Sequence, residues 1–222
     1  MLLLAVDTSG KQGSIALARG DPGGSCEIIE VLALEGGTFS AQLIPQVADL
    51  LSKHGFQKKD LGGFAVASGP GSFTGLRVGL AAIKALGEAT GRPIAAVSLL
   101  EAVAVAGAGT VLAALDAGRG EVYLGHYEVG NNRVKMVSEK LVTRAELVEI
   151  AAGATVVAGA KSLAEALKSE GIAVQGIETP RSDAIARLGW RKILAGDRVS
   201  PAALEANYIR RTDAEIFAKS NS

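Results

Sequence analysis

The sequence predicts an α/β protein in which one order of elements occurs twice: three strands, then helix, strand, helix, strand and helix. An apolar strand that ends in an aspartate occurs at Leu3–Asp7 and again at Leu112–Asp116, and self-similarity of this kind indicates a duplicated unit. Apolar residues form 48% of the 222-residue chain and aromatic residues only 4%. This composition favours helices packed closely on sheets through small side chains.

The first half of the chain shows the complete order of elements. Short apolar or alternating runs predict strands at Leu3–Val6, Gly13–Leu17, Glu27–Leu34, Phe64–Ala67 and Ile94–Val97. Longer runs with helical spacing predict helices at Ser40–His54, Leu76–Ala89 and Leu99–Ala106.

The second half repeats that order. Strands are expected at Val111–Leu115, Gly120–Leu124, Arg133–Leu141, Thr155–Ala158 and Ile172–Gln175, with a hairpin turn at Gly130-Asn131-Asn132. Helices are expected at Arg144–Ala151, Leu163–Ser169 and Asp183–Leu194. Capping boxes, in which a Ser or Thr precedes a Glu by three positions, mark helix starts at Ser98, Thr143, Ser162 and Thr212.

This order is that of the duplicated ribonuclease-H-like fold, which actin, sugar kinases and the Hsp70 ATPase domain share. We therefore expect a first lobe at residues 1–107 and a second at 108–200, joined near Gly107. The segment 201–222, with a predicted helix at 213–218, is expected to return to the first lobe.

The segment Val66–Gly79 reads as a strand that turns tightly into a helix, through Ser68-Gly69-Pro70-Gly71. Free amides at a helix N-terminus can hold an anion, so a phosphate loop is one interpretation. The glycine spacing fits neither a P-loop, because Leu76 stands where the lysine is required, nor the dinucleotide fingerprint, which would have one residue fewer. A capped tight turn without a ligand is the favoured interpretation.

The same segment carries a resemblance to a known family. Ser68-Gly-Pro-Gly-Ser-Phe-Thr-Gly-Leu-Arg-Val-Gly79 resembles the signature of the bacterial TsaB (YeaZ) family of tRNA threonylcarbamoyladenosine biosynthesis proteins. Further matching segments follow in order along nearly the whole chain: Leu4–Ser9, Ser40-x-x-Leu43-x-Pro45, Leu115–Tyr123 and Tyr208-Ile209-Arg210. Phe39 and Ala206 depart from the family, which often has His and Pro at these places.

The resemblance implies a non-catalytic scaffold subunit of the complex that modifies the adenosine next to the tRNA anticodon. It implies as partners the catalytic paralogue TsaD and the ATPase TsaE, with tRNA bound only through the complex and a homodimer possible in isolation. Two enzyme classes stay open as alternatives: a nucleotide-binding phosphotransferase of the same superfamily and, less favoured, a metallopeptidase.

The residues offer little for catalysis or for a cofactor. In kinases of the superfamily, acids at the places of Asp7 and Asp116 face the nucleotide, so these two with Thr8, Ser9 and Gly10 form a candidate weak phosphate site. The adenosine side of such a site is not recognisable, so ATP or ADP is expected at most weakly, at the level of the complex. The only histidines, His54 and His126, are far apart in sequence, so no metal site is expected.

The predicted helices Ser40–His54 and Leu76–Ala89 carry more apolar surface than contact with one sheet requires. The resemblance favours a helix–helix interface with TsaD, and a core buried on two sides is the alternative. The residues expected at this partner face are Phe39, Leu43, Ile44, Val47, Leu50, Phe73, Arg77, Leu80 and Ile83.

The charge balance and the cysteine content argue against a nucleic-acid-binding, membrane-binding or disulfide-bonded protein. Lys plus Arg equals Asp plus Glu at 23 each, so no net field attracts nucleic acid or a membrane. The single Cys26 allows no internal disulfide and fits a reducing compartment. We expect a cytoplasmic protein without a membrane span or a signal peptide, and no catalytic serine at Ser72, which reads as a helix cap.

Overall fold

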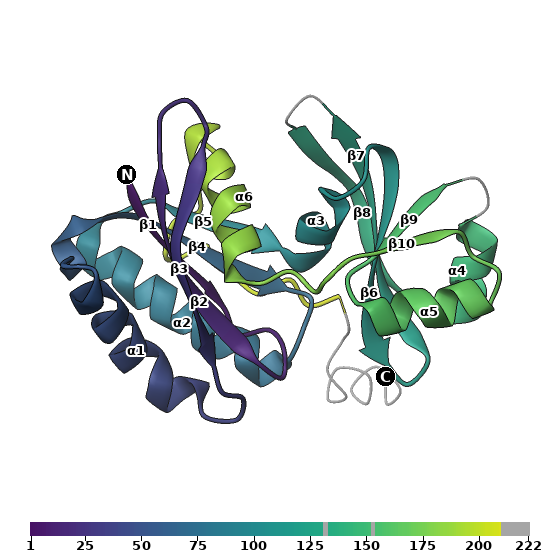
Figure 1. Ribbon diagram of the computed structural model, residues 1–222, viewed down its shortest axis with the longest axis horizontal. Helices are drawn as coiled ribbons and strands as arrows, with labels where there is room; N and C mark the ends of the chain where they lie inside the picture. The colour runs from purple at the N-terminus through teal and green to yellow at the C-terminus, as the bar shows by residue number, and fades with distance from the viewer. Residues whose placement is uncertain (131–132, 152–153, 210–222) are drawn as a thin grey trace, which may run out of the picture. The chain divides into compact units, whose positions relative to one another are not determined.

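The computed structural model describes residues 1–130, 133–151 and 154–209. The predicted hairpin turn at Asn131–Asn132, the capping box at Thr212 and the helix expected at 213–218 therefore lie outside the described residues. The described residues form two compact units (Figure 1): residues 1–102 with 180–206, and residues 103–179 with 207–209.

The first unit is built on a five-stranded mixed sheet with the order β3-β2-β1-β4-β5. The central strand β1 pairs antiparallel with β2 and parallel with β4. The strands span Leu2–Asp7 (β1), Gly13–Gly20 (β2), Cys26–Leu34 (β3), Leu61–Gly69 (β4) and Ile94–Ser98 (β5). Each lies within a few residues of its predicted position.

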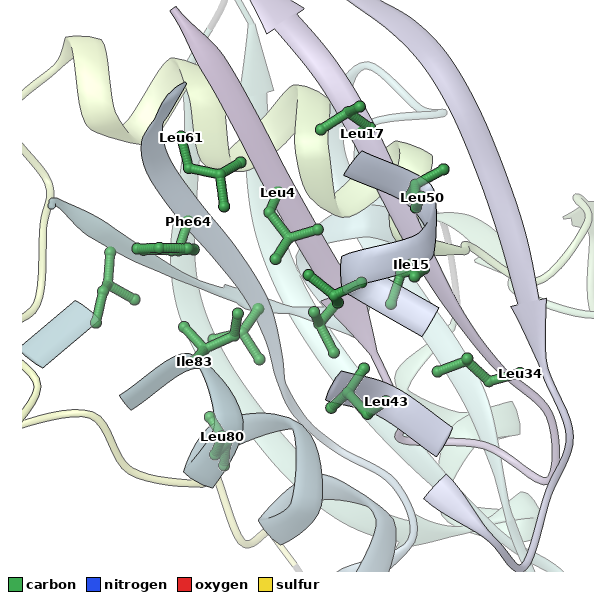
Figure 2. Packing of buried hydrophobic residues seen from close by; sticks show 14 of the residues in the cluster. Leu4, Ile15, Leu17, Leu34, Leu43, Leu50, Leu61, Phe64, Leu80 and Ile83 are labelled. Atoms are coloured by element: carbon green, nitrogen blue, oxygen red, sulfur yellow. The ribbon is translucent and has the colours of Figure 1, made fainter. Parts of the chain in front are cut away.

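Helices α1 (Phe39–Lys53) and α2 (Phe73–Thr90) cover one face of this sheet, and a short 3-10 turn, η1 (Lys58–Asp60), precedes β4. Side chains alternate along a strand, so one face of β1 carries Leu2, Leu4 and Val6 into a core shared with both helices. Figure 2 shows Leu4 and Ile15 from the sheet among Leu43 and Leu50 of α1 and Leu80 and Ile83 of α2.

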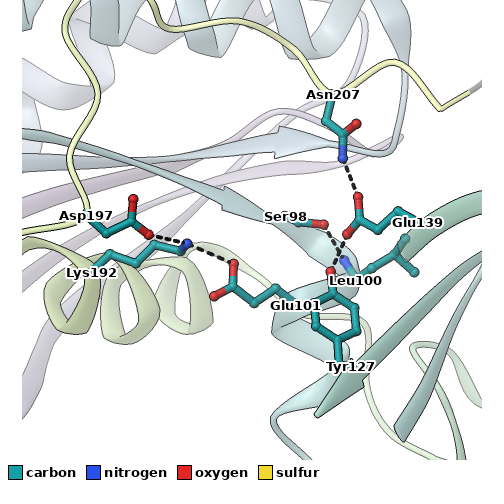
Figure 3. A network of polar contacts seen from close by, with 8 residues as sticks. All are labelled: Ser98, Leu100, Glu101, Tyr127, Glu139, Lys192, Asp197 and Asn207. Carbon is teal, nitrogen blue, oxygen red and sulfur yellow. Dashed lines mark hydrogen bonds and ion pairs between the residues drawn. The ribbon is translucent and has the colours of Figure 1, made fainter. Parts of the chain in front are cut away.

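The opposite face of the first sheet carries small side chains and is covered by α6 (Ser182–Leu194). A Cβ added at Gly189 would collide with Ala65 of β4, so the helix rests directly on the strand. Lys192 of the same helix forms ion pairs with Asp197 at 2.9 Å and Glu101 at 3.3 Å (Figure 3). The glycine and alanine content of this contact brings helix and sheet close together.

The position of α6 corrects the expected domain boundaries. The sequence order placed the last helix, and residues up to 200, in the second lobe, but residues 180–206 belong to the first unit. The boundary after the first half falls within α3 (Leu99–Ala104), between Ala102 and Val103, rather than at Gly107. Sequence order predicts which element comes next, whereas the complementary alanine face on the first sheet decides where it packs.

The second unit has a sheet of the same topology, with the order β10-β9-β6-β7-β8. Its central strand β6 again pairs antiparallel with the next strand and parallel with the fourth. The strands span Gly109–Gly118 (β6), Glu121–Gly130 (β7), Arg133–Thr143 (β8), Thr155–Ala158 (β9) and Val174–Gly176 (β10). The repeated strand order confirms the duplicated ribonuclease-H-like α/β fold.

Two short helices, α4 (Arg144–Ile150) and α5 (Lys161–Ser169), pack with this second sheet around Leu112, Leu124 and Leu147. On β7, the hydroxyl of the buried Tyr127 donates to Glu139 of β8, which also accepts a hydrogen bond from the Asn207 side chain (Figure 3). Of the segment expected to return to the first lobe, residues 201–206 belong to the first unit and residues 207–209 to the second, and the rest lies outside the described residues.

No helix among the described residues has both the length and the apolar character required to cross a membrane.

Candidate functional site

The turn between β4 and α2 combines a side-chain helix cap with a glycine in a positive-φ conformation. Ser72 is the N-cap of α2, and its hydroxyl accepts a hydrogen bond from the Gly75 amide at 3.3 Å. Gly69 has a φ of +126°, which side chains other than glycine rarely tolerate. The capped turn predicted from the sequence is confirmed.

The glycines of this turn are required by the end of β1, which lies directly against it. The Thr8 hydroxyl donates to the Gly75 carbonyl at 2.7 Å and accepts from the Gly79 amide at 3.2 Å. A Cβ at Gly75 would overlap the Thr8 carbonyl oxygen, and one at Gly79 would meet the Thr8 hydroxyl. The spacing of these two glycines therefore serves the close packing of α2 on β1.

This packing consumes donors that an anion would need. The Ser72 amide donates to the Ser9 carbonyl at 2.6 Å, and the Gly75 amide is bound to the Ser72 side chain. A phosphate loop keeps such amides available for its ligand. The geometry thus favours a structural turn over a phosphate-binding loop.

Two of the residues predicted to bind phosphate at the end of β1, Asp7 and Ser9, form hydrogen bonds with each other. Asp7 is 7% exposed, and one carboxylate oxygen accepts hydrogen bonds from both the amide and the hydroxyl of Ser9. Burial raises the pKa of the Asp7 carboxyl above its ordinary value of 3.8, and the Ser9 hydrogen bonds oppose part of that rise. Thr8 is buried and Gly10 is exposed.

Asp116 occupies the same place at the end of the first strand of the second sheet. It is exposed, and its carboxylate accepts from the Gly118 amide at 3.0 Å, as a turn-forming aspartate does. Asp7 and Asp116 belong to different units. Joint phosphate binding by the two residues stays a prediction.

A groove of about 460 Å³ lies between α1 and α2 on their outer side. Two large apolar residues line it, Ile44 with 50% and Phe73 with 37% of the residue's surface exposed. The Arg77 guanidinium lies over the Phe73 ring, 3.7 Å from the ring centroid. The remaining lining is small or apolar: Ser40, Leu43, Thr74, Val78, Ala81 and Ala82.

The predicted partner-face residues divide between this groove and the core. Only Ile44, Phe73 and Arg77 are exposed. The other expected residues are at most 7% exposed and pack on the sheet: Phe39, Leu43, Val47, Leu50, Leu80 and Ile83. Their assignment as a partner surface is thereby corrected, because one face of each helix is already buried within the chain. Leu43 alone of these buried residues also borders the groove.

The two departures from the family pattern are both apolar and packed. Phe39 begins α1, and a Cβ at Gly13 would touch its ring. Ala206 packs against the same core as a partly buried residue. In this chain, therefore, neither place presents a polar side chain.

Within the described residues, no three His, Cys, Asp or Glu side chains lie together as metal ligands would. His54 contacts Glu30 at 2.7 Å, beside the ion pair of Lys53 with the same carboxylate. His126 lies on β7, in the other unit. The absence of a bound metal or cofactor stays a prediction.

Sequence reasoning missed two features of this region. The tie between Thr8 and the α2 glycines joins residues far apart in sequence, so no local pattern reveals it. The stacking of Arg77 on Phe73 could have been anticipated, because residues four apart lie on one face of a helix.

Comparison with known proteins agrees with the resemblance. A family model described as TsaD, tRNA N6-adenosine threonylcarbamoyltransferase, matches residues 36–194. The tRNA threonylcarbamoyladenosine biosynthesis protein TsaB of Bacillus subtilis is 37% identical over 140 residues, which cover 62% of this chain and 59% of that protein. TsaB of Escherichia coli is 34% identical over 139 residues, covering 60% of this chain and 58% of its own length.

A solved structure covers more of the chain. An uncharacterized Pseudomonas aeruginosa protein with similarity to peptidase YEAZ superposes with a TM-score of 0.76 at 27% identity, covering 94% of this chain and 99% of the other. The sequence matches span a little under three fifths of the two curated TsaB proteins. The chain belongs to the family that the TsaD model describes and, within it, to the TsaB/YeaZ proteins.

Proposed function

We propose that this chain is a non-catalytic scaffold subunit in the biosynthesis of tRNA threonylcarbamoyladenosine, the process that appears in the names of its TsaB relatives. In this proposal it binds a TsaD-type catalytic paralogue through the groove between α1 and α2, and a TsaE-type ATPase completes the assembly. The tRNA is bound only through that complex, in the cytoplasm.

The observation that carries the proposal is the apolar groove itself. Ile44 and Phe73 leave large apolar surfaces in water on neighbouring helices, and exposed apolar surface that is grouped in this way marks interaction sites. The small residues Ala81 and Ala82 line the same groove, so another helix can approach closely. A helix laid in an apolar groove is a common mode of protein recognition.

The chemistry of the described residues supports a scaffold over an enzyme. Metal-assisted catalysis needs clustered ligands, and no such cluster occurs among the residues that the structure describes. Ser72 is occupied as a helix cap, and the buried Asp7 is held by Ser9. We propose that the chain has no cofactor of its own and that ATP or ADP binds only weakly, at the level of the complex.

The test is binding of the purified TsaD-type paralogue from the same organism, measured by calorimetry. Charged substitutions at Leu43 of α1 or Leu80 of α2 would damage the core, because both residues are buried. Ile44→Asp places a charge on an exposed position instead, and should weaken binding by about 2 kcal/mol or more, about 30-fold. Formation of threonylcarbamoyladenosine by the reconstituted complex should fall with it.

The matched control is Val148→Asp on α4 in the other unit, at a residue that is 42% exposed. It makes the same kind of change away from the groove and should leave binding intact. Thermal melting establishes that both variants fold. If folded Ile44→Asp binds the paralogue as tightly as wild type, the groove is not the interface and the proposal fails.

A further inference from the structure

A second cavity, of about 500 Å³, lies at the C-terminal end of α2. It is formed between two stretches of the first unit that are far apart in sequence, residues 87–93 and residues 198–201. On α2 the groove described above ends at Ala82 and this cavity begins at Gly87, more than one helical turn further along. The groove and the cavity share no lining residue, so each can be altered without the other.

The backbone on both sides of this cavity is held by hydrogen bonds. On one side, α2 ends at Gly91 in the left-handed conformation (φ +64°), and the Pro93 carbonyl accepts from the Phe64 amide at 2.9 Å. On the other side, the Val199 amide donates to the Ile94 carbonyl at 2.9 Å. The side chains around the cavity therefore extend from fixed positions.

Two arginines line the cavity, and both have donors available for a ligand. The Nε and Nη2 atoms of Arg198 donate to the Ile193 carbonyl at 3.1 and 3.0 Å, which leaves the remaining N–H donors of the guanidinium unused. Arg92 is exposed, and within the described part of the chain it forms no ion pair. The cavity thus combines one guanidinium of fixed position with a second that can adjust to a ligand.

The charges around the cavity favour an anion. Glu88 also lines it, but no ion pair joins Glu88 to another described residue, so two arginines face one carboxylate. Lys84 adds a further cation nearby, with its Nζ 3.5 Å from the carbonyl oxygen of Ala202, the residue after the lining residue Pro201. These cations outweigh Glu88 and the partial negative charge at the end of α2.

The donors and the lining indicate a phosphate on a nucleic-acid backbone. Guanidinium groups bind phosphate oxygens through paired N–H donors, and the Ser200 hydroxyl at the same cavity can donate as well. A protein that holds bases does so by stacking them on aromatic side chains, and none of the described residues at this cavity is aromatic. A backbone phosphate needs no such ring, because contacts to phosphate position a nucleic acid without reading its bases.

We propose that this cavity binds a backbone phosphate of the tRNA through Arg92 and Arg198. This inference rests on the proposed function, which supplies the tRNA. The chain as a whole has equal numbers of basic and acidic residues, so the contact positions a tRNA that the complex holds and does not retain tRNA on the chain alone.

The test measures binding of an unmodified tRNA transcript to the complex of this chain with the TsaD-type paralogue. Arg92→Met removes the charge and keeps much of the length of the side chain. It should weaken tRNA binding about tenfold at about 0.1 M salt, and it should lower the slope of log affinity against log salt concentration by about 1. Calorimetry should show unchanged binding of the paralogue, because Arg92 lies outside the groove lining.

Two further variants distinguish a phosphate contact from a structural effect. Glu88→Gln removes the acid of the cavity and should strengthen tRNA binding severalfold, an opposite change that loss of structure would not produce. Arg19→Met is the matched control: it removes an exposed arginine from β2, in the same unit but outside the cavity lining, and should leave tRNA affinity nearly unchanged. Thermal melting establishes that all three variants fold.

The outcomes separate this inference from the proposed function. If Arg92→Met weakens tRNA binding no more than Arg19→Met does, the phosphate site is wrong, while intact binding of the paralogue leaves the proposed function standing. If inorganic phosphate binds the chain alone through Arg92 and tRNA affinity does not depend on Arg92, the cavity takes a small phosphate and the assignment to tRNA is overturned. If the wild-type chain does not bind the paralogue, the proposed function fails and this inference fails with it.

Discussion

The turns that follow the fourth strand of each sheet differ, although the two sheets share one strand order. In the first unit, α2 begins with glycine as its third residue, Gly75, and is bonded through Thr8 to the end of β1. In the second unit, α5 has Leu163 at the same place, and this side chain lies in the core. The same topology is thus stabilised by backbone contact in one unit and by side-chain packing in the other.

The difference shows what each helix can tolerate. A helix that contacts a strand through glycines is destabilised by an added methyl group, because the group has no space. A helix that packs through leucines is destabilised when the side chain is shortened, because a cavity remains. It also shows why the signature of the first turn looks like a phosphate loop: glycines required for close approach and glycines required for a ligand produce similar sequence patterns.

An enlarged residue at the third position of α2 should destabilise the first unit, and a shortened residue at the third position of α5 should destabilise the second. We expect these to be the largest effects. Gly75→Ala forces a methyl group onto the Thr8 carbonyl and should cost the first unit about 3 kcal/mol of unfolding free energy. Leu163→Ala leaves a cavity beneath α5 and should cost the second unit about 3 kcal/mol.

The single tryptophan separates the two results. Trp190 lies on α6 in the first unit and is 4% exposed. Urea unfolding followed by Trp190 fluorescence should shift strongly for Gly75→Ala and weakly for Leu163→Ala, while circular dichroism detects both. Equal shifts of the fluorescence transition by the two variants would mean that the units unfold as one.

Helix caps offer a smaller contrast between the units. Thr143 caps α4 and forms a complete capping box with Glu146, whereas Thr38 precedes α1 without a side-chain cap bond. Thr143→Ala should cost about 1 kcal/mol of unfolding free energy, and Thr38→Ala should cost clearly less. Chemical denaturation of both variants measures this, and an equal loss at Thr38 would contradict the difference.

The pH dependence of stability should have opposite signs at Asp7 and Glu146, and we expect this effect to be the smallest. Burial raises the pKa of Asp7 above 3.8, so the folded state holds its proton more tightly than the unfolded state. Its contribution to stability is therefore lost as pH rises from 3.8 through the raised pKa.

Glu146 behaves in the reverse way. Hydrogen bonds from the backbone and side chain of Thr143 lower its pKa below 4.5, so its contribution is present above 4.5 and is lost as pH falls through the lowered value. Thermal melting from about pH 3 to about pH 7 should show Asp7→Asn gaining stability relative to wild type as pH rises, and Glu146→Gln losing it. Parallel curves for the two variants would refute both assignments.

Local patterns predicted most elements and part of the candidate site. The strands at Phe64–Ala67 and Thr155–Ala158 and the cap at Thr143 follow from residues that are neighbours in sequence. The partner face was predicted too broadly, because a wide apolar stripe on α1 does not reveal which of its residues meet the sheet. Leu43 turned inward and Ile44 outward, although both belong to that stripe.

The sequence by itself determined the duplicated order of strands and helices, because apolar periodicity and turn residues act over a few positions. It also determined the family, through a long motif at Ser68–Gly79. Only the tertiary structure decided that α6 covers the first sheet, that Thr8 holds α2, and that Arg77 lies over Phe73 at an open groove. These outcomes depend on the fit between surfaces that are distant in sequence, or on which face of a helix the core leaves exposed.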